Sequence, residues 1–230
     1  MTGPGPWLAA LAEPHALFAL GLTARTALVT LPLHLAAGLA LGAWLARGRS
    51  PLKTAVEMAV TLPLVFPPVA IGFVLLMLLG RRGVVGAFLL EHAGVELVFS
   101  FHGVVLASFV AGLPLVVRPV QSAIRSLPPA LAEAALVLGK TPLQAFFLAV
   151  LPAVRRSLAA GMILAFGRSL GEVGITMMLG GNILGRTNTL SLEIYNAVSA
   201  GEFESAAALC TLLGAVSACV FWALRRLGAF

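Results

Sequence analysis

Two oppositely charged residues stand four positions apart inside an apolar run in the C-terminal half of the chain. Arg168 and Glu172 lie within FGRSLGEVGITMMLGG, residues 166–181. A spacing of four places both on one face of a helix, and a charge inside a bilayer is costly unless it is paired or hydrated. Ser169 and Thr176 extend that face. The four side chains are therefore candidates for the lining of an anion pathway, and a structural ion pair or a contact between two copies of the chain fits the spacing equally well.

Other chemistry finds little support in the sequence. Cys210 and Cys219 are nine residues apart in one apolar run, which puts them on opposite faces of a helix, so they form no disulfide with each other. No GxxxxGK[ST] loop is present to cradle ATP. The histidines share no metal-ligand spacing and are expected as isolated polar side chains near helix ends: His15, His34, His92 and His102. We expect no catalytic site, no metal and no cofactor held by this chain.

The composition requires a bilayer as solvent. Apolar residues make up 60% of the 230 residues and charged residues 10%, against roughly a quarter charged in soluble domains. The 15 Lys and Arg residues outnumber 9 acidic residues, all of them Glu. These charges are scattered between apolar runs, which argues against nucleic-acid binding and for the basic bias of cytoplasmic loops. The first apolar run is too long for a cleavable signal, so we expect it to be retained.

Five segments are long and apolar enough to cross a membrane, which predicts an all-α integral membrane protein forming a single domain over residues 1–230. The predicted spans are residues 17–46, 55–79, 97–117, 157–179 and 206–224. Several prolines interrupt them, as membrane helices tolerate where neighbours satisfy the freed backbone groups. The GxxxG pairs at Gly38 and Gly42 and at Gly167 and Gly171 predict close helix packing.

Basic residues are distributed unevenly between the two sides of these spans. Three lie on one side: Arg81, Arg82 and Arg186. Ten lie on the other: Arg47, Arg49, Lys53, Arg118, Arg125, Lys140, Arg155, Arg156, Arg225 and Arg226. Because cytoplasmic loops carry the excess of Lys and Arg, the N-terminus is predicted outside and the C-terminus inside.

The cytoplasmic segment 118–156 is rich in Ala and Leu and does not resemble a linker. Pro128 and Pro129 suit the start of a helix, and Gly139 suits its end. Pro142 begins a second short helix that Pro152 is expected to end. Two short helices joined at a glycine would present a knob to the cytosol, suited to docking a partner.

This segment resembles the EAA loop of ABC-importer permeases, with the family spacing kept and Ala149 at the usual Ile position. The matching residues are Glu133, Ala134, Ala135, Gly139, Leu151 and Pro152. Residues 61–80 and 166–198 resemble molybdate permeases, whose close relatives carry sulfate, thiosulfate and tungstate. The resemblance implies the type I importer fold, without the extra N-terminal span that some members have.

The resemblance also implies a set of partners in a bacterial inner membrane. Two permease copies would form the pathway, two cytosolic ATPases would hold ATP and Mg²⁺, and a periplasmic or lipid-anchored protein would deliver the oxyanion. No nucleic acid is implied. Glu133 would make a polar contact to the ATPase, and Gly139 the turn. The polar segment 180–204 would face the binding protein, through Asn182, Arg186, Asn188, Glu193 and Tyr195.

Two other classes remain open at this stage. An ion-coupled secondary transporter or channel would explain Arg168 and Glu172 but leaves the EAA-like loop unexplained. A membrane anchor without a pathway would not need prolines or charges inside its spans. A neighbouring ATPase gene and a binding-protein gene would separate the ABC permease from both.

The topology gives the first testable prediction. Reporter fusions after Arg49, Arg82, Lys140 and Arg226 should read inside, outside, inside and inside, because of the basic-residue bias. Paired alkaline phosphatase and fluorescent protein fusions measure this directly. A cytoplasmic signal after Arg82 would contradict the five-span arrangement.

Overall fold

The computed structural model describes residues 13–224, and all the regular secondary structure in this part of the chain is helical. Four long helices lie side by side: α2 (Pro14–Ala46), α6 (Phe101–Ser126), α9 (Leu151–Leu170) and α12 (Phe203–Leu224). With the helical turns that precede α9, all four are long and apolar enough to cross a membrane, and a pair bent by 46° is a fifth candidate. The predicted all-α membrane architecture is confirmed.

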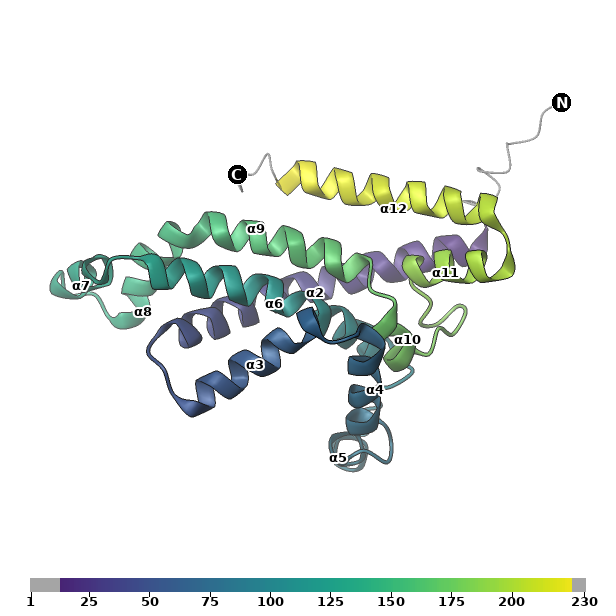
Figure 1. The fold of residues 1–230 in the computed structure, drawn as a ribbon, viewed down its shortest axis with the longest axis horizontal. Coiled ribbons are helices and arrows are strands. Elements are labelled where there is room, and N and C mark those ends of the chain that lie inside the picture. Colours follow the sequence, from purple (N-terminus) through teal and green to yellow (C-terminus); the bar gives the residue numbers. More distant parts are fainter. Residues whose placement is uncertain (1–12, 225–230) are drawn as a thin grey trace.

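The remaining helices decorate this bundle (Figure 1). They are α3 (Pro51–Val65), α4 (Pro68–Leu79), α5 (Val84–Ala93), α7 (Pro129–Val137), α8 (Pro142–Ala145), the π-helical η1 (Phe146–Val150), α10 (Gly174–Gly180) and α11 (Leu190–Ala200). α7 and α8 lie at one end of the bundle, and α11 lies towards the other. α4 and α5 project from the side of the bundle and form the bent pair.

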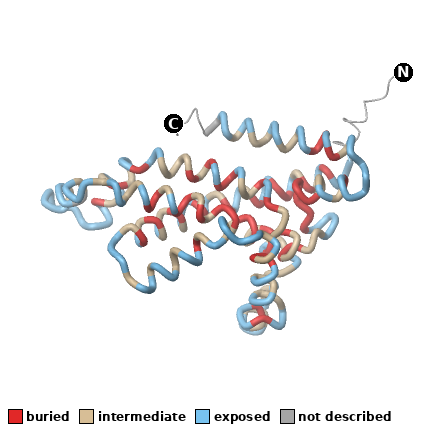
Figure 2. The backbone as a smooth tube through the Cα atoms, viewed as in Figure 1, coloured by how far each residue is buried: buried red, intermediate tan, exposed pale blue. Residues whose placement is uncertain are grey.

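The buried face of α2 is made mainly of small and polar residues, with Leu22 and Leu45 as its large apolar members. Its inner members recur at helical spacing and are Thr23, Thr26, Thr30, His34, Gly38 and Gly42. In contrast, Leu28 is 75% exposed on the same helix. Figure 2 shows the buried residues concentrated where the long helices meet. This inverted pattern suits a helix surrounded by lipid, where apolar side chains need no burial and small residues permit close contact.

The first glycine pair makes the predicted close packing, and the second does not. A methyl group on Gly38 would lie 2.3 Å from Val116 Cγ1, and one on Gly42 would lie 2.7 Å from Val120 Cγ1. The backbone of α2 therefore packs directly against the valine side chains of α6. A methyl group on Gly167 would meet nothing within 4 Å in the described chain. The packing prediction for Gly167 and Gly171 is therefore wrong within one copy of the chain.

The second predicted span, residues 55–79, is not one helix. α3 ends at Val65 and α4 begins at Pro68, with Phe66 and Pro67 extended between them. A proline disfavours helical geometry in the residue before it and lacks an N–H, so two successive prolines break the helix here. The third predicted span, residues 97–117, extends as α6 to Ser126, while the first and fifth agree with α2 and α12 within a few residues.

The predicted loop 118–156 is much shorter in the structure. α6 occupies its first residues, and from Pro142 the chain is helical through η1 into α9. Pro152 does not end the second short helix, because the N–H of Leu151 bonds five residues back to the carbonyl of Phe146. This π turn replaces the hydrogen-bond pattern that a proline would disrupt.

The fourth predicted span, residues 157–179, is also broken. α9 ends at Leu170 and α10 starts at Gly174. Arg168 and Glu172 therefore lie at a helix break. The prediction that one continuous helix carries both is wrong. The polar segment that follows is not a plain loop, because it contains α11. Arg225 and Arg226 lie outside the described residues.

His34 corrects the expectation that the histidines lie near helix ends. It sits well inside α2 with no exposed surface. Its Nε2 is 2.9 Å from the carbonyl oxygen of Phe109 on α6, and its ring stacks on the Phe109 ring. The close approach of α2 and α6 supplies this partner. Cys210 and Cys219 are both free and exposed.

The α2–α6 contact predicts unequal effects for two glycine substitutions on one helix. Gly42→Ala should lower the free energy of unfolding of the detergent-purified protein by about 1–3 kcal/mol, and with it the melting temperature, since the new methyl group overlaps Val120. Gly21→Ala is the matched control, because its methyl group would meet no atom within 4 Å. Equal melting temperatures for the two variants would contradict the packing described here.

Candidate functional site

Arg168 and Glu172 form an ion pair at the end of α9. Arg168 Nη1 lies 2.5 Å from Glu172 Oε2, and the two side chains are 32% and 1% exposed. The two side chains meet as the spacing of four suggests, but the predicted common helix face is wrong, because α9 ends at Leu170, Glu172 lies two residues beyond it and Thr176 lies on α10. A carboxylate this deeply buried needs the guanidinium, because an unpaired buried charge is strongly destabilising.

Glu172 also holds the start of α10. Its Oε1 accepts a hydrogen bond of 2.6 Å from the backbone N–H of Ile175, and so satisfies one of the free donors that every helix start presents. One carboxylate thus joins the end of α9 to the beginning of α10. The geometry gives Glu172 a structural task, while a role for Arg168 in the pathway stays a prediction.

Ser169 and Thr176 lie on either side of this junction. Ser169 donates a hydrogen bond of 2.9 Å to the carbonyl oxygen of Ser108 on α6. Thr176 is 1% exposed, and its hydroxyl has no hydrogen-bond partner among the described residues. The break after α9 is therefore a polar region inside an otherwise apolar bundle.

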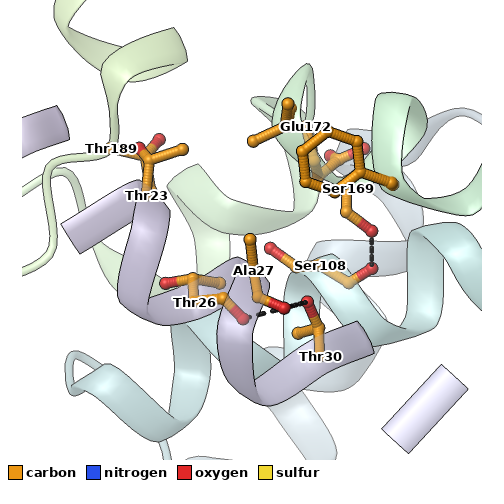
Figure 3. Close-up of a pocket in the computed structure, with 10 residues that line it drawn as sticks. Thr23, Thr26, Ala27, Thr30, Ser108, Ser169, Glu172 and Thr189 are labelled. Carbon is orange, nitrogen blue, oxygen red and sulfur yellow. Dashed lines mark hydrogen bonds between the residues drawn. The ribbon is translucent and has the colours of Figure 1, made fainter. Parts of the chain in front are cut away.

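Figure 3 shows the small cavity beside this junction, at the meeting of α2, α6 and α9. Its volume is about 10 Å³, which is room for one water molecule. Its polar lining is Thr23, Thr26, Thr30, Ser108, Ser169, Glu172 and Thr189. The hydroxyl groups come from both halves of the chain, because Ser169 and Thr189 line the cavity together with the threonines of α2. The two halves also meet directly, since the hydroxyl of Thr23 accepts a hydrogen bond from the N–H of Leu190 in α11.

Sequence reasoning missed the threonine contribution to this region. The signal was available, because Thr23, Thr26 and Thr30 recur at spacings of three and four, which marks one face of a helix. Sequence reasoning also missed Glu57 of α3, which pairs with Arg118 and lies 3.7 Å from Arg125. The available signal was that Glu57 is the one acidic residue in its apolar run, so it needed a basic partner.

The knob predicted from the EAA-like pattern exists as α7. Gly139 has φ +74°, as its position at a helix end predicts. The N–H of Lys140 bonds to the carbonyl oxygen of Ala135, and that of Gly139 to Leu136. These two bonds are the Schellman ending that places glycine in the left-handed region.

The surface of α7 is unusually apolar for a helix end outside the bundle. Glu133 and Ala134 are exposed, and so are Val137 at 87% and Leu138 at 77%. Exposed apolar side chains grouped at one place mark an interaction site. α7 therefore has the surface of a docking element rather than that of a solvated loop.

The chain after α7 returns to helix within a few residues. Thr141 and Gln144 form a reciprocal capping box at the start of α8. Leu151 and Pro152, the last residues of the EAA-like pattern, lie directly after the π turn. From Pro142 the helix is continuous to Leu170, so α7 is connected through one helix to the junction at Arg168.

Most of the residues predicted for docking at the other end bond to one another. The Nδ2 of Asn188 donates to Asn182 at 3.3 Å and to Glu193 at 2.6 Å, and the Nδ2 of Asn182 donates to Asn196 at 2.6 Å. Asn188 is buried, whereas Arg186 and Tyr195 are exposed. The network shapes this surface, in which Asn182 and Glu193 are half-buried, and Arg186 and Tyr195 lie beside it as the most exposed of the five predicted residues.

Within residues 13–224, no three His, Cys, Asp or Glu side chains come together as they would to hold a metal ion. The polar groups described above instead serve helix ends, helix contacts and two exposed surfaces.

Comparison with known proteins identifies the family. Residues 38–229 match the family of binding-protein-dependent transport system inner membrane components, and the chain belongs to it. The chain is 39% identical over 193 residues to the molybdenum transport system permease protein ModB of Azotobacter vinelandii, covering 84% of this chain and 85% of that protein. It is 36% identical to the chloroplastic sulfate permease 2 of Chlamydomonas reinhardtii, over 94% of this chain and 58% of that one.

Among solved structures, the fold is similar to that of a bacterial ABC transporter that imports the acidic polysaccharide alginate. The TM-score is 0.77 at 18% identity, over 99% of this chain and 83% of that one. A bacterial alginate ABC transporter in complex with an alginate pentasaccharide-bound periplasmic protein gives a TM-score of 0.72 at 20% identity, over 99% of this chain and 81% of the matched chain. The type I importer fold expected from the sequence is confirmed.

The Arg168–Glu172 pair predicts an asymmetric response to mutation. Arg168→Ala should lower the free energy of unfolding by about 3–5 kcal/mol, because it leaves the buried carboxylate of Glu172 unpaired. Arg168→Ala combined with Glu172→Gln should recover much of that loss, since the amide oxygen can still accept from Ile175. Thermal unfolding of the purified protein measures both.

Transport assays on the same variants separate structure from pathway. A pathway role for Arg168 requires the double variant to assemble normally and still transport poorly. If transport recovers together with stability, Arg168 is structural only, and its place in the predicted pathway is lost.

Proposed function

We propose that this chain is the membrane-spanning permease subunit of an ATP-driven importer and that its cargo is molybdate. The observation that carries the cargo assignment is the 39% identity to the ModB permease of Azotobacter vinelandii over most of both chains. The permeases of the same name from Haemophilus influenzae and Escherichia coli support it, each also at 39% identity. The apolar knob at α7 supports the coupling to an ATPase.

Sulfate is the second candidate cargo. The sulfate permease of Chlamydomonas reinhardtii matches 94% of this chain at 36% identity, so the sequence of the spans alone discriminates weakly between the two oxyanions. Both are tetrahedral dianions, and selection between them falls to the partner that delivers the cargo.

In this proposal ATP is hydrolysed by two cytosolic partner subunits, which hold ATP and Mg²⁺. Each would receive one α7 knob, with the apolar side chains at Val137 and Leu138 buried in the contact and Glu133 at its polar edge. This places α7 on the cytoplasmic side, α11 outside, the N-terminus outside and the C-terminus inside, in agreement with the basic-residue bias.

A second copy of the chain completes the pathway in this proposal. One copy leaves many large apolar side chains exposed on α3, α4 and α5, including Val65 at 82%, Phe73 at 54% and Phe88 at 58%. Some of this surface faces lipid, and part of it would face the partner copy. A binding protein would dock at the opposite end from α7, over Arg186 and Tyr195, and release the oxyanion there.

The coupling proposal predicts the effect of changing the turn after α7. Gly139→Val should displace the knob, because φ +74° is strained for a β-branched residue. We expect loss of ATPase co-purification or uncoupled ATP hydrolysis, with normal membrane insertion. Glu133→Ala should have a milder effect, since it removes one exposed polar contact.

Gly94 provides the matched control, because it also ends a helix with positive φ but lies at the end of α5. Gly94→Val should leave ATPase co-purification intact. The measurements are co-purification, ATPase rate and oxyanion uptake in liposomes. Normal values of all three in Gly139→Val would remove the main support for α7 as the coupling element.

The cargo proposal is tested by direct competition. Proteoliposomes containing the permease, its ATPases and its binding protein should take up molybdate with a lower KM than sulfate, and calorimetry on the binding protein should give the same order. Tungstate is the matched third ligand. Preference for sulfate in both measurements would favour the second candidate.

A further inference from the structure

A second and much larger cavity, about 780 Å³, opens on the side of the molecule away from α7. It lies between α4, α5, the segment 95–99 and the turn that carries Ile183 and Arg186. The apolar part of its wall includes Leu76, Leu79, Leu90 and Val98. The Arg168–Glu172 junction does not contribute to its lining.

Three arginines line this cavity, and one glutamate partly balances them. Arg81 is paired with Glu96, with Nη2 and Oε1 2.8 Å apart. Neither Arg82 nor Arg186 has a carboxylate within 4.0 Å in the described part of the chain, and both also lie on the cavity lining. The lining therefore carries a formal charge of +2.

This arrangement favours a dianion. A guanidinium presents paired N–H donors in a fixed fork that suits the oxygens of a tetrahedral oxyanion. Arg82 and Arg186 are both exposed, so an anion that enters the cavity from the solvent can reach their guanidinium groups. The two unpaired arginines come from segments that are about a hundred residues apart in sequence, and the fold brings both to one cavity.

We propose that Arg82 and Arg186 hold a doubly charged tetrahedral oxyanion in this cavity, as a waiting site on the outer side of the permease. The inference rests on the proposed function, because it takes the cargo of the importer as the ligand. The phosphate of an anionic lipid headgroup offers the same chemistry, and the experiment separates the two sources. Arg186 then belongs to cargo capture as well as to the surface beneath a docked binding protein.

The test measures oxyanion binding to the permease–ATPase complex without binding protein and without ATP. Equilibrium dialysis with radiolabelled molybdate is done in detergent and in nanodiscs of neutral phosphatidylcholine. Saturable binding of one anion per permease chain is expected, and Arg82→Gln combined with Arg186→Gln should weaken it at least about tenfold. Arg155→Gln combined with Arg156→Gln is the matched control, with the same charge change on exposed residues at the α7 end of α9.

A third variant predicts a gain. Glu96→Gln frees the guanidinium of Arg81 from its partner and should tighten binding by several-fold, which general damage to the fold would not do. Absence of saturable binding to the wild-type complex, or equal weakening by the two double variants, would overturn the proposal. So would loss of binding in nanodiscs containing phosphatidylglycerol together with arginine-dependent retention of that lipid, which identifies the headgroup as the ligand.

Uptake assays keep this result distinct from the proposed function. If liposomes with the complete transporter import molybdate but the complex alone binds none, only the waiting site is wrong. If the wild-type transporter imports no oxyanion at all, the proposed function itself fails.

Discussion

The close contact between α2 and α6 is the constraint on which the other features of the bundle depend. Lipid tails are as apolar as leucine, so burial of apolar side chains does not draw helices together in a membrane, and close packing must do so instead. Gly38 and Gly42 allow the backbone of α2 to reach Val116 and Val120. The same approach gives the buried ring of His34 its partner on α6 and places the threonine face of α2 beside the end of α9.

Features encoded by neighbouring residues could be predicted from the sequence. α7 and its left-handed ending at Gly139 follow from two prolines, a run of helix formers and one glycine, all within a dozen residues. The positions of the helix breaks were harder to predict. The apolar run 157–179 contains no proline, and nothing in its hydropathy shows that α9 stops at Leu170. Beyond this point the side chain of Glu172 accepts the hydrogen bond of the Ile175 N–H at the start of α10.

The polar contacts that were missed join residues distant in the chain. Glu57 pairs with Arg118, 61 residues away, and Thr23 receives the N–H of Leu190, 167 residues away. A single sequence shows that a buried polar group needs a partner, but not which partner the fold provides. The docking residues illustrate the converse, because Asn182, Asn188 and Glu193 look free in the sequence and bond within one local network in the structure.

The unbroken helix from Pro142 to Leu170 has a mechanical consequence. Its 29 residues give a rod of roughly 44 Å at 1.5 Å per residue. If such a rod pivots at one end by about 5°, its far end travels roughly 4 Å, which exceeds the length of a hydrogen bond. Such a tilt would therefore break the 2.6 Å hydrogen bond between Glu172 and the N–H of Ile175 if α10 stayed in place. The length of this helix would thus convert a small change of angle at its α7 end into a displacement of several ångströms beside the Arg168–Glu172 junction.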